Sequence, residues 1–232
     1  MSHKENETIT VAWVDNGFVN GKFTDGLIKT IFESKKYGIN IINNIREYGP
    51  LIAEQRQKVI NTWINKLDTD WILWVDSDVV INSKSLKLIW DIADKDKFPV
   101  VSGLYFVSFE YETSMFKIVP AAFNKNNTND LHKEIEKSLL GDGKIFKVDK
   151  VGFGFLIMHR SVIEKMYSVM DNKLSLFSAI AYKDNEKNMG EDLAFCSILE
   201  KAKIPLYLHS GALSEHLKVF PIDINYYKKF NK

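Results

Sequence analysis

Five consecutive apolar residues, Trp-Ile-Leu-Trp-Val at positions 71–75, constrain the fold of this chain more than any other feature. A strand with apolar side chains on both faces has to be covered on both faces, which is typical of a parallel sheet between layers of helices. Strand-like and helix-like patterns alternate over the first hundred residues, and further strands are expected at 8–14, 39–42 and 99–103. We therefore predict an α/β fold with a mainly parallel central sheet flanked by helices.

Apolar residues at helical spacing fill the intervals between these runs. Helices are expected to begin near Asp25, after Pro50 and at Ser83 or Ser85, where a serine side chain would cap the first turn. The predicted elements of the second half are extended runs at 115–119 and 144–148, a polar loop at 124–130, a strand at 155–158, helices from Ser161 and over 192–203, and a last core strand at 205–208.

The chain has 232 residues, with 31 basic and 30 acidic side chains and a net charge of +1. This balance supplies no general excess of charge for binding a phosphate backbone or an anionic membrane. The single cysteine, Cys196, excludes an intramolecular disulfide bond. The charged start has no apolar run to act as a signal peptide, and no apolar stretch approaches the roughly 18 residues of a membrane helix. We therefore expect one cytoplasmic domain without a membrane span.

Asp-x-Asp sequences occur at 68–70, 94–96 and 76–78. The first lies in a predicted turn and the second at a charged helix end, so both are expected at the surface. Asp76 and Asp78 directly follow the buried apolar strand, and the carboxyl ends of parallel strands are where open α/β sheets bind ligands. Two carboxylates there can both reach one hard cation such as Mg²⁺ or Mn²⁺, whose remaining sites phosphates commonly take. The structural alternative is a turn with two solvated aspartates.

Three further features have chemistry that fits a site, although each also has an ordinary structural explanation. Glu191 and Asp192 begin a predicted amphipathic helix, where acidic residues also favour the helix dipole. The Gly-Phe-Gly sequence at 152–154 permits close backbone approach but lacks the remaining glycine of a dinucleotide-binding fingerprint. His216, just past the last predicted core strand, can ligate a metal, contact a phosphate or lie at the surface.

Motifs of several other enzyme classes are absent from the sequence. It contains no Gly-x-Ser-x-Gly elbow of serine hydrolases, no Walker phosphate-binding loop and no His-Glu-x-x-His helix of zinc proteases. Cys196 falls on the predicted inward face of its helix and is expected to pack as a small hydrophobic residue rather than act as a nucleophile.

The ordered set of motifs resembles the GT-A fold glycosyltransferases, and in particular small bacterial, phage and viral members of the family-2 type. The acidic sequence Gly-Glu-Asp-Leu-Ala-Phe-Cys at 190–196 matches theirs closely, and 151–162 is similar to their glycine-rich strand that leads into a helix. Residues 101–105 look like their glycine-aromatic strand. Residues 51–57 look like their segment with an Ala-Arg-Asn core, from which two glutamines depart. The resemblance covers most of 8–220.

This resemblance implies a metal-dependent enzyme that moves a sugar from a nucleotide-diphospho-sugar, with a UDP-sugar favoured, to an acceptor hydroxyl. It divides the single domain 1–232 into a nucleotide-binding half at 8–103, an acceptor-side half at 104–220 and a C-terminal tail at 221–232. The acceptor stays open among a glycan, a lipid, a protein and a modified nucleic-acid base, and so does the oligomeric state.

The resemblance also implies donor-side roles for individual residues. Asp76 and Asp78 would hold Mn²⁺ or Mg²⁺ against the donor diphosphate, and His216 would complete the metal shell. Asp15 is expected near the nucleotide base or ribose, and Arg56 is expected to face the nucleotide phosphates.

The resemblance also implies that Gly103, Tyr105 and Gly154 lie on the acceptor and sugar side of the site. Asp192, with Glu191 as the second candidate, would deprotonate the acceptor hydroxyl in an inverting enzyme, whereas in a retaining enzyme the acidic pair would orient hydroxyl groups. Two alternatives stay open. One is a nucleotidyltransferase, which has a related α/β core and a metal-bound triphosphate, and the other is a non-catalytic adaptor that binds a sugar or a nucleotide.

Overall fold

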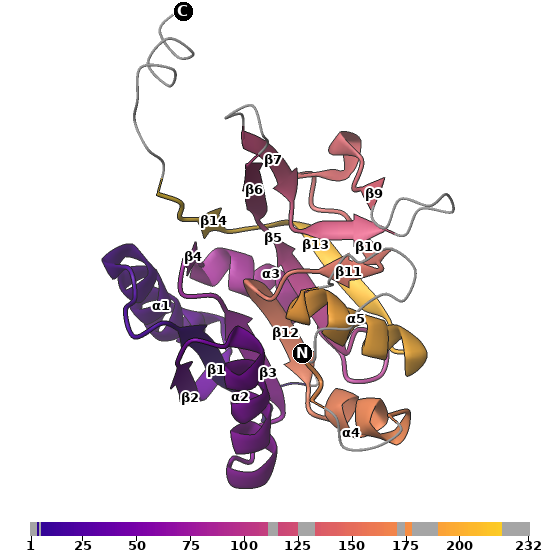
Figure 1. Cartoon of the computed structure of the whole chain (residues 1–232). Helices are drawn as coiled ribbons and strands as arrows, with labels where there is room; N and C mark the ends of the chain where they lie inside the picture. The colour runs from indigo at the N-terminus through magenta and orange to yellow at the C-terminus, as the bar shows by residue number, and fades with distance from the viewer. Residues whose placement is uncertain are drawn as a thin grey trace, which may run out of the picture.

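The computed structural model describes residue 4 and residues 6–110, 116–124, 133–170, 175–177 and 190–219. A seven-stranded sheet with helices on both faces forms the centre of the molecule (Figure 1). Its strand order is β10-β13-β5-β12-β3-β1-β2. The strands are β1 (Thr8–Asp15), β2 (Asn40–Tyr48), β3 (Trp71–Val75), β5 (Val100–Leu104), β10 (Ile145–Val148), β12 (Phe155–His159) and β13 (Leu206–Leu213).

Five of the seven strands run in one direction, while β10 and β12 run against them. The prediction of a mainly parallel α/β sheet is confirmed. The reversed strand β12 lies between β3 and β5 and pairs antiparallel with both. Its direction is not visible in the sequence, because a strand covered on both faces is apolar throughout whichever way it runs.

The apolar strand β3 contributes to a separate hydrophobic core on each face of the sheet. Ile72 and Trp74 belong to one core, whereas Trp71, Leu73 and Val75 belong to the other. All five are at most 1% exposed. The alternation of side chains along a strand therefore explains why every position of this run is apolar.

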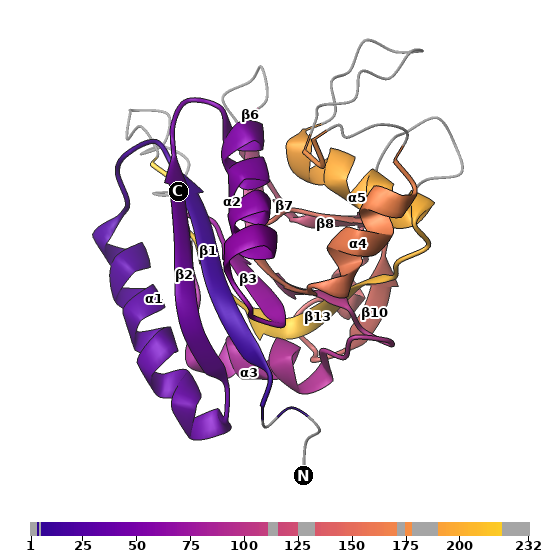
Figure 2. The same cartoon turned by 90° about the horizontal axis from the view of Figure 1, so that it is seen from below.

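Helices cover both faces, as Figure 2 shows. α1 and α3 contribute buried residues to one core, and α2, α4 and α5 contribute to the other. The helices are α1 (Gly21–Ser34), α2 (Ile52–Lys66), α3 (Ser83–Ile92), α4 (Ser161–Ser168) and α5 (Glu191–Lys201), with the short 3₁₀ helices η1 (Lys35–Tyr37) and η2 (Lys137–Leu139).

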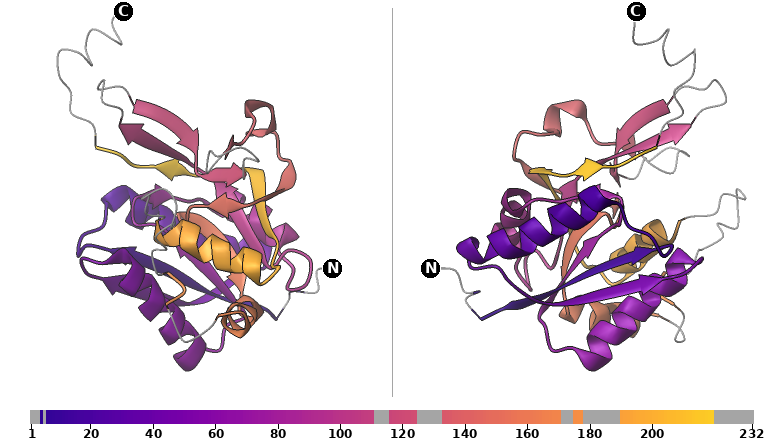
Figure 3. Two further views of the ribbon diagram at one scale, coloured as in Figure 1. Left: turned by 45° about the vertical axis from the view of Figure 1, so that its right-hand side comes forward. Right: turned by 90° about the vertical axis from the view of Figure 1, so that its left-hand side faces the viewer.

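Short strands form three small sheets that lie together on one side of the central sheet (Figures 1 and 3). β6 pairs with β7, β8 pairs with β9 and β11, and β14 pairs with β4. The last pairing places the segment after β13 directly on the segment that follows β3. The strands are β4 (Val79–Val80), β6 (Phe106–Glu110), β7 (Phe116–Pro120), β8 (Ala122–Asn124), β9 (Lys133–Glu134), β11 (Lys150–Val151) and β14 (Glu215–His216).

Helix boundaries differ from the sequence predictions at two N-termini. The side chain of Asn82, rather than a serine, caps α3 by accepting a hydrogen bond from the backbone N–H of Ser85 at 2.9 Å. Asn20 caps α1 through the backbone N–H of Lys22, so this helix begins before Asp25. Both asparagines match the preference of N-caps for short polar side chains.

Two predicted segments lie largely or wholly outside the described residues. Of the polar loop at 124–130, only Asn124 is described, at the end of β8. The tail at 221–232 lies wholly outside them. Among the helices of the described part, none is both long enough and apolar enough to cross a membrane.

Candidate active site

The turn after β3 carries Asp76 and Asp78, and distant parts of the chain fix it. The backbone N–H of Asp76 donates to the carbonyl of Gly154 at 3.2 Å, and the N–H of Val79 donates back to the carbonyl of Asp76 at 2.9 Å. The N–H of Leu217 donates to the carbonyl of Asp78 at 2.7 Å. The structure therefore brings the predicted metal-binding turn next to the glycine-rich strand and the segment after β13.

Arg56, on α2, joins this turn to the acidic pair at the start of α5. Its Nη2 atom lies 2.9 Å from Oδ1 of Asp76, and its Nη1 atom lies 3.1 Å from Oε1 of Glu191. The Arg56 side chain is 3% exposed, and its guanidinium carbon lies 4.9 Å from the centroid of the Phe153 ring. A buried cation requires charged partners, so Arg56 holds two carboxylates from separate elements in one place. Its expected contact with nucleotide phosphates stays a prediction.

Asp192 belongs to the same cluster but has a different environment. Its Oδ1 atom accepts a hydrogen bond from the backbone N–H of Leu193 at 2.7 Å, and its Oδ2 atom lies beside Gly152. Burial raises the pKa of Asp192 to about 6, against the opposing effect of Arg56 and together with the negative charge of Glu191. A carboxyl group with this pKa is mostly ionised at pH 7 yet accepts a proton readily, which suits a general base.

Tyr105 is buried between the two glycines of the Gly-Phe-Gly sequence. The backbone N–H of Gly154 donates to the Tyr105 hydroxyl oxygen at 3.1 Å. A Cβ atom added at Gly152 would lie 2.1 Å from this hydroxyl oxygen. A Cβ atom added at Gly154 would lie 2.7 Å from the Cζ atom of Tyr105. These positions are glycine because the tyrosine ring occupies the space of a side chain. Burial, with the charge of Asp76, raises the pKa of Tyr105 well above its usual value, so its hydroxyl keeps its proton.

Asp78 contacts two side chains from the segment that follows β13. Its Oδ2 atom lies 3.0 Å from Nε2 of His216 and 2.9 Å from Nζ of Lys218. Although burial opposes the shift, hydrogen bonds from these two side chains lower the pKa of Asp78 to about 2. The His216 ring packs edge-on against the Tyr105 ring, with centroids 5.4 Å apart. Tyr105 therefore packs against His216, which contacts Asp78, and against the glycines beside Asp192.

The donor atoms of Asp78 and His216 fit a divalent cation. Nδ1 of His216 lies 2.7 Å from the carbonyl oxygen of Phe106, which only accepts hydrogen bonds, so Nδ1 carries a hydrogen in the neutral ring. Nε2 then directs a lone pair at the carboxylate 3.0 Å away, and two such acceptors require a proton or a metal cation between them. Neighbouring ligands of an octahedral cation with bonds of about 2.1 Å also lie about 3.0 Å apart.

A bound metal would need ligands beyond this pair. Within the described residues, no three His, Cys, Asp or Glu side chains converge as a ready-made metal site. Mg²⁺ is commonly held by one or two carboxylates together with substrate phosphates, so a bound diphosphate would have to supply further ligands. The carboxylate of Asp76 is already paired with Arg56.

Two other predicted site residues have structural partners of their own. The carboxylate of Asp15, at the end of β1, is 1% exposed and pairs with Arg46, whose Nε atom lies 2.7 Å from Oδ2. This pairing lowers the pKa of Asp15. Gly103 lies in β5, where a Cβ atom would come within 2.1 Å of the Phe155 ring and 2.8 Å of the Ala212 carbonyl. Close packing explains this glycine, and its role on the acceptor side stays a prediction.

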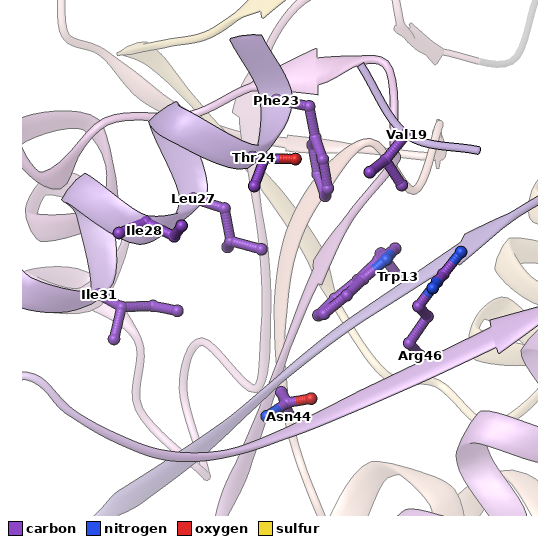
Figure 4. Close-up of a pocket in the computed structure, with 9 residues that line it drawn as sticks. All are labelled: Trp13, Val19, Phe23, Thr24, Leu27, Ile28, Ile31, Asn44 and Arg46. Atoms are coloured by element: carbon purple, nitrogen blue, oxygen red, sulfur yellow. The ribbon is translucent and has the colours of Figure 1, made fainter. Parts of the chain in front are cut away.

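A pocket of about 260 Å³ opens between α1 and the strands β1 and β2. Figure 4 shows its apolar side chains, which include Trp13, Phe23 and Leu27, with Arg46 at one end. Arg46 connects it to Asp15, but none of the pocket's lining residues belongs to the predicted site set. Its face of the sheet carries the core of α1 and α3, whereas Arg56 and α5 lie on the opposite face.

The remaining aspartate pairs are not part of this cluster. Asp94 accepts hydrogen bonds from two following backbone N–H groups and is exposed, as predicted. The surface prediction for 68–70 is wrong in part, because Asp70 accepts a hydrogen bond from the backbone N–H of Thr8 at 2.8 Å and Thr69 is 1% exposed. Cys196 is buried as expected, and burial raises its pKa to about 12.

Comparison with known proteins identifies the fold. No protein-family model matches the sequence, and no curated protein is significantly similar to it. Among solved structures, A197 from STIV matches 90% of this chain and 86% of its own, with a TM-score of 0.53 and 21% identity. GalNAc-T7, solved with UDP, GalNAc and Mn²⁺, matches 91% of this chain but 44% of its own, with a TM-score of 0.50 and 9% identity.

The chain has a GT-A fold. The expectation from the ordered motifs is therefore confirmed at the level of architecture, and the structure is similar to nucleotide-sugar glycosyltransferases. In this GT-A fold, Asp76 and Asp78 follow the central strand β3, while Glu191 and Asp192 begin a helix on the Arg56 face.

Three residues of the site were not singled out from the sequence. Lys218 follows His216 by two positions, and its contact with Asp78 depends on the pairing of β14 with β4. Arg46 lies in β2 opposite Trp13 and reaches Asp15 across the parallel pairing of β1 and β2. Gly152 belongs to the Gly-Phe-Gly sequence that was expected to permit close backbone approach, but the ring that requires it comes from Tyr105, far away in the sequence.

Proposed function

We propose that the protein is a metal-dependent glycosyltransferase that moves a sugar from a nucleotide-diphospho-sugar, with a UDP-sugar favoured, to an acceptor hydroxyl. One observation carries this proposal: within one GT-A site, Asp78 contacts His216 and the ammonium of Lys218, while burial raises the pKa of Asp192 to about 6. Sugar transfer needs a charge-neutralising centre at the leaving diphosphate and a base at the acceptor. The presence of UDP and Mn²⁺ in the GalNAc-T7 structure supports the choice of nucleotide and metal.

On the donor side, Asp78 and His216 would hold Mn²⁺ or Mg²⁺. When bound, such a cation neutralises the negative charge that develops on the departing nucleoside diphosphate. Asp76 would keep its orientation through Arg56 and face the ribose or the cation. Because Arg56 shares its charge with Glu191 as well, the donor and acceptor parts of the site are positioned by the same side chain.

On the acceptor side, Asp192 would act as the general base of a direct displacement. The acceptor hydroxyl oxygen forms a bond to the anomeric carbon, the bond from that carbon to the diphosphate oxygen breaks, and the hydroxyl proton moves to the Asp192 carboxylate. Glu191 is tied to Arg56 and serves as a positioning residue. The buried hydroxyl of Tyr105 keeps its proton and packs against the glycines beside Asp192, so it would help to position this side of the site.

Isothermal titration of UDP and GDP, each with and without Mn²⁺, tests the proposal. We expect one of them, UDP in the favoured case, to bind with a dissociation constant that rises at least about 100-fold without the metal or in Asp78→Ala. Asp96→Ala is the matched control, because it removes the last carboxylate of another Asp-x-Asp sequence that is exposed. Circular dichroism shows whether each variant is folded.

Two results would contradict the proposal. Binding of UDP or GDP that needs no metal and is unchanged in Asp78→Ala would favour a nucleotide-binding adaptor. Tighter metal-dependent binding of a nucleoside triphosphate than of either diphosphate would favour a nucleotidyltransferase.

A further inference from the structure

Lys218 makes a contact that neither the fold nor the proposed reaction requires. Its ammonium nitrogen lies 2.9 Å from Oδ2 of Asp78, the same oxygen that His216 approaches at 3.0 Å. An ammonium group therefore lies on the carboxylate oxygen at which the proposed divalent cation would bind. A monovalent and a divalent cation that share one oxygen repel each other, so the two cannot both be bound there favourably.

The backbone around Lys218 is held by several contacts, whereas its side chain is partly exposed. β14 pairs with β4, the N–H of Leu217 donates to the carbonyl of Asp78 at 2.7 Å, and Glu215 forms an ion pair with Lys22. The Lys218 side chain itself is 37% exposed. Its ammonium is carried on a flexible four-carbon stem. The ammonium can therefore leave Asp78 without any change in the backbone contacts of residues 215–217.

The donor diphosphate is a favourable destination for a displaced ammonium at this position. The proposed donor brings a diphosphate to Asp78 and His216, and lysine binds phosphate as a compact point charge. The attachment of residues 215–217 to the Asp78 turn keeps the ammonium within reach of any phosphate bound there. No other partner of Lys218 among the described residues is an acidic group.

We propose that Lys218 is a tethered cation that occupies Asp78 while the metal is absent and moves to the donor diphosphate when the metal binds. This proposal rests on the proposed function. Lys218 then has two opposite effects on binding: it weakens the binding of the metal alone and strengthens the binding of the nucleoside diphosphate in the presence of the metal.

Lys218→Ala separates these effects. Mn²⁺ binding without nucleotide is measured from the loss of the electron paramagnetic resonance signal of free Mn²⁺, and we expect its dissociation constant to fall about 3- to 10-fold. UDP or GDP, whichever the wild-type protein binds more tightly, is then titrated at saturating Mn²⁺, and its dissociation constant should rise about 10-fold. Lys218→Arg keeps a cation and should show smaller changes in both measurements.

Lys22→Ala is the matched control, since it removes a lysine that holds the same segment through Glu215 but does not contact Asp78. It should leave both constants within about twofold of the wild type. A purely structural role of Lys218 would weaken both binding events, and this result, or no change in either constant, would overturn the proposal. Asp78→Ala in the same series tests the proposed function separately: if it leaves Mn²⁺ binding unchanged, the metal assignment itself is wrong.

Discussion

Asp78 and Asp192 belong to one site, yet the pKa of the first is lowered to about 2 and that of the second is raised to about 6. Burial raises the pKa of both carboxyl groups, although the Asp78 side chain is 43% exposed. The difference comes from their neighbours. Asp78 has the imidazole of His216 and the ammonium of Lys218 on one oxygen, whereas the cation that lowers the pKa of Asp192 is paired with two other carboxylates.

The cation near Asp192 is Arg56, whose single charge is paired with Asp76 and with Glu191. The three carboxylates around it therefore carry more negative charge than it can neutralise. Asp192 is the member of the cluster without a direct ion pair to Arg56 in the described structure, and it has the raised pKa. The separation of the two pKa values follows from which carboxylate each cation reaches, as in other sites with neighbouring carboxyl groups.

The largest expected effect is the loss of activity in Asp192→Asn. This variant keeps the shape of the side chain but cannot accept a proton, so the release of UDP from a UDP-sugar should slow by about 10²- to 10⁴-fold. UDP binding should stay within about twofold of the wild type, because Asp192 does not contact Asp78 or His216. A chromatographic assay of UDP release, together with calorimetry, measures both properties.

Asp78→Ala should differ from Asp192→Asn in the property that it changes most. It should weaken UDP binding strongly, whereas Asp192→Asn should leave UDP binding nearly unchanged. Glu191→Gln serves as a control for charge removal next to Asp192. If Asp192→Asn weakened UDP binding as strongly as Asp78→Ala does, the two aspartates would not have separate roles and the comparison would fail.

The second effect concerns Arg56, on which the difference between the two aspartates depends. Arg56→Met leaves Asp76 and Glu191 without their buried partner, and the free energy of unfolding should fall by about 3 kcal/mol. The pKa of Asp192 should rise further, because Arg56 acts to lower it. Urea denaturation and the pH profile of activity measure these changes. Arg56→Lys keeps the charge but loses the planar head group that reaches two carboxylates, so it should recover part of the stability.

Equal stability of Arg56→Met and the wild type would mean that the two ion pairs do not organise the site. In that case the expected role of Arg56 at the nucleotide phosphates, which follows from the family resemblance, would be the better explanation for this residue.

The sequence was sufficient to predict the parts of the fold that depend on local patterns. The apolar run of β3 indicated a sheet covered on both faces, and the structure confirms two cores around it. The position of Asp76 and Asp78 at the end of that strand follows from the same argument. Helix starts were less predictable, because serine and asparagine are comparable N-caps and asparagine caps both α1 and α3.

The contacts that give the site its chemistry could not be predicted in the same way. Tyr105 and Gly152 are almost fifty positions apart, and their fit depends on how β12 lies beside β3 and β5. The sequence did not indicate that Arg56 lies between two carboxylates, since the distance from α2 to α5 is a property of packing, and its expected contact with phosphates stays a prediction. Charge pairing across the fold, rather than any motif, separates Asp78 from Asp192.

The smallest expected effect is a dependence of stability on pH that distinguishes the two aspartates. The folded pKa of Asp192 is raised above its unfolded value, so between about pH 4 and pH 6 the folded protein binds more protons than the unfolded chain, and stability falls as the pH rises. Asp78, with a lowered pKa, contributes stability that is lost as the pH falls from about 4 to about 2. Asp192→Asn should therefore be more stable than the wild type at pH 7, by about 2 kcal/mol, and equally stable near pH 4. Urea denaturation at pH 4, 5, 6 and 7 measures this difference. A constant difference across that range would show that the Asp192 carboxyl titrates as it does in the unfolded chain, and burial behind Arg56 would then not account for its role as a base.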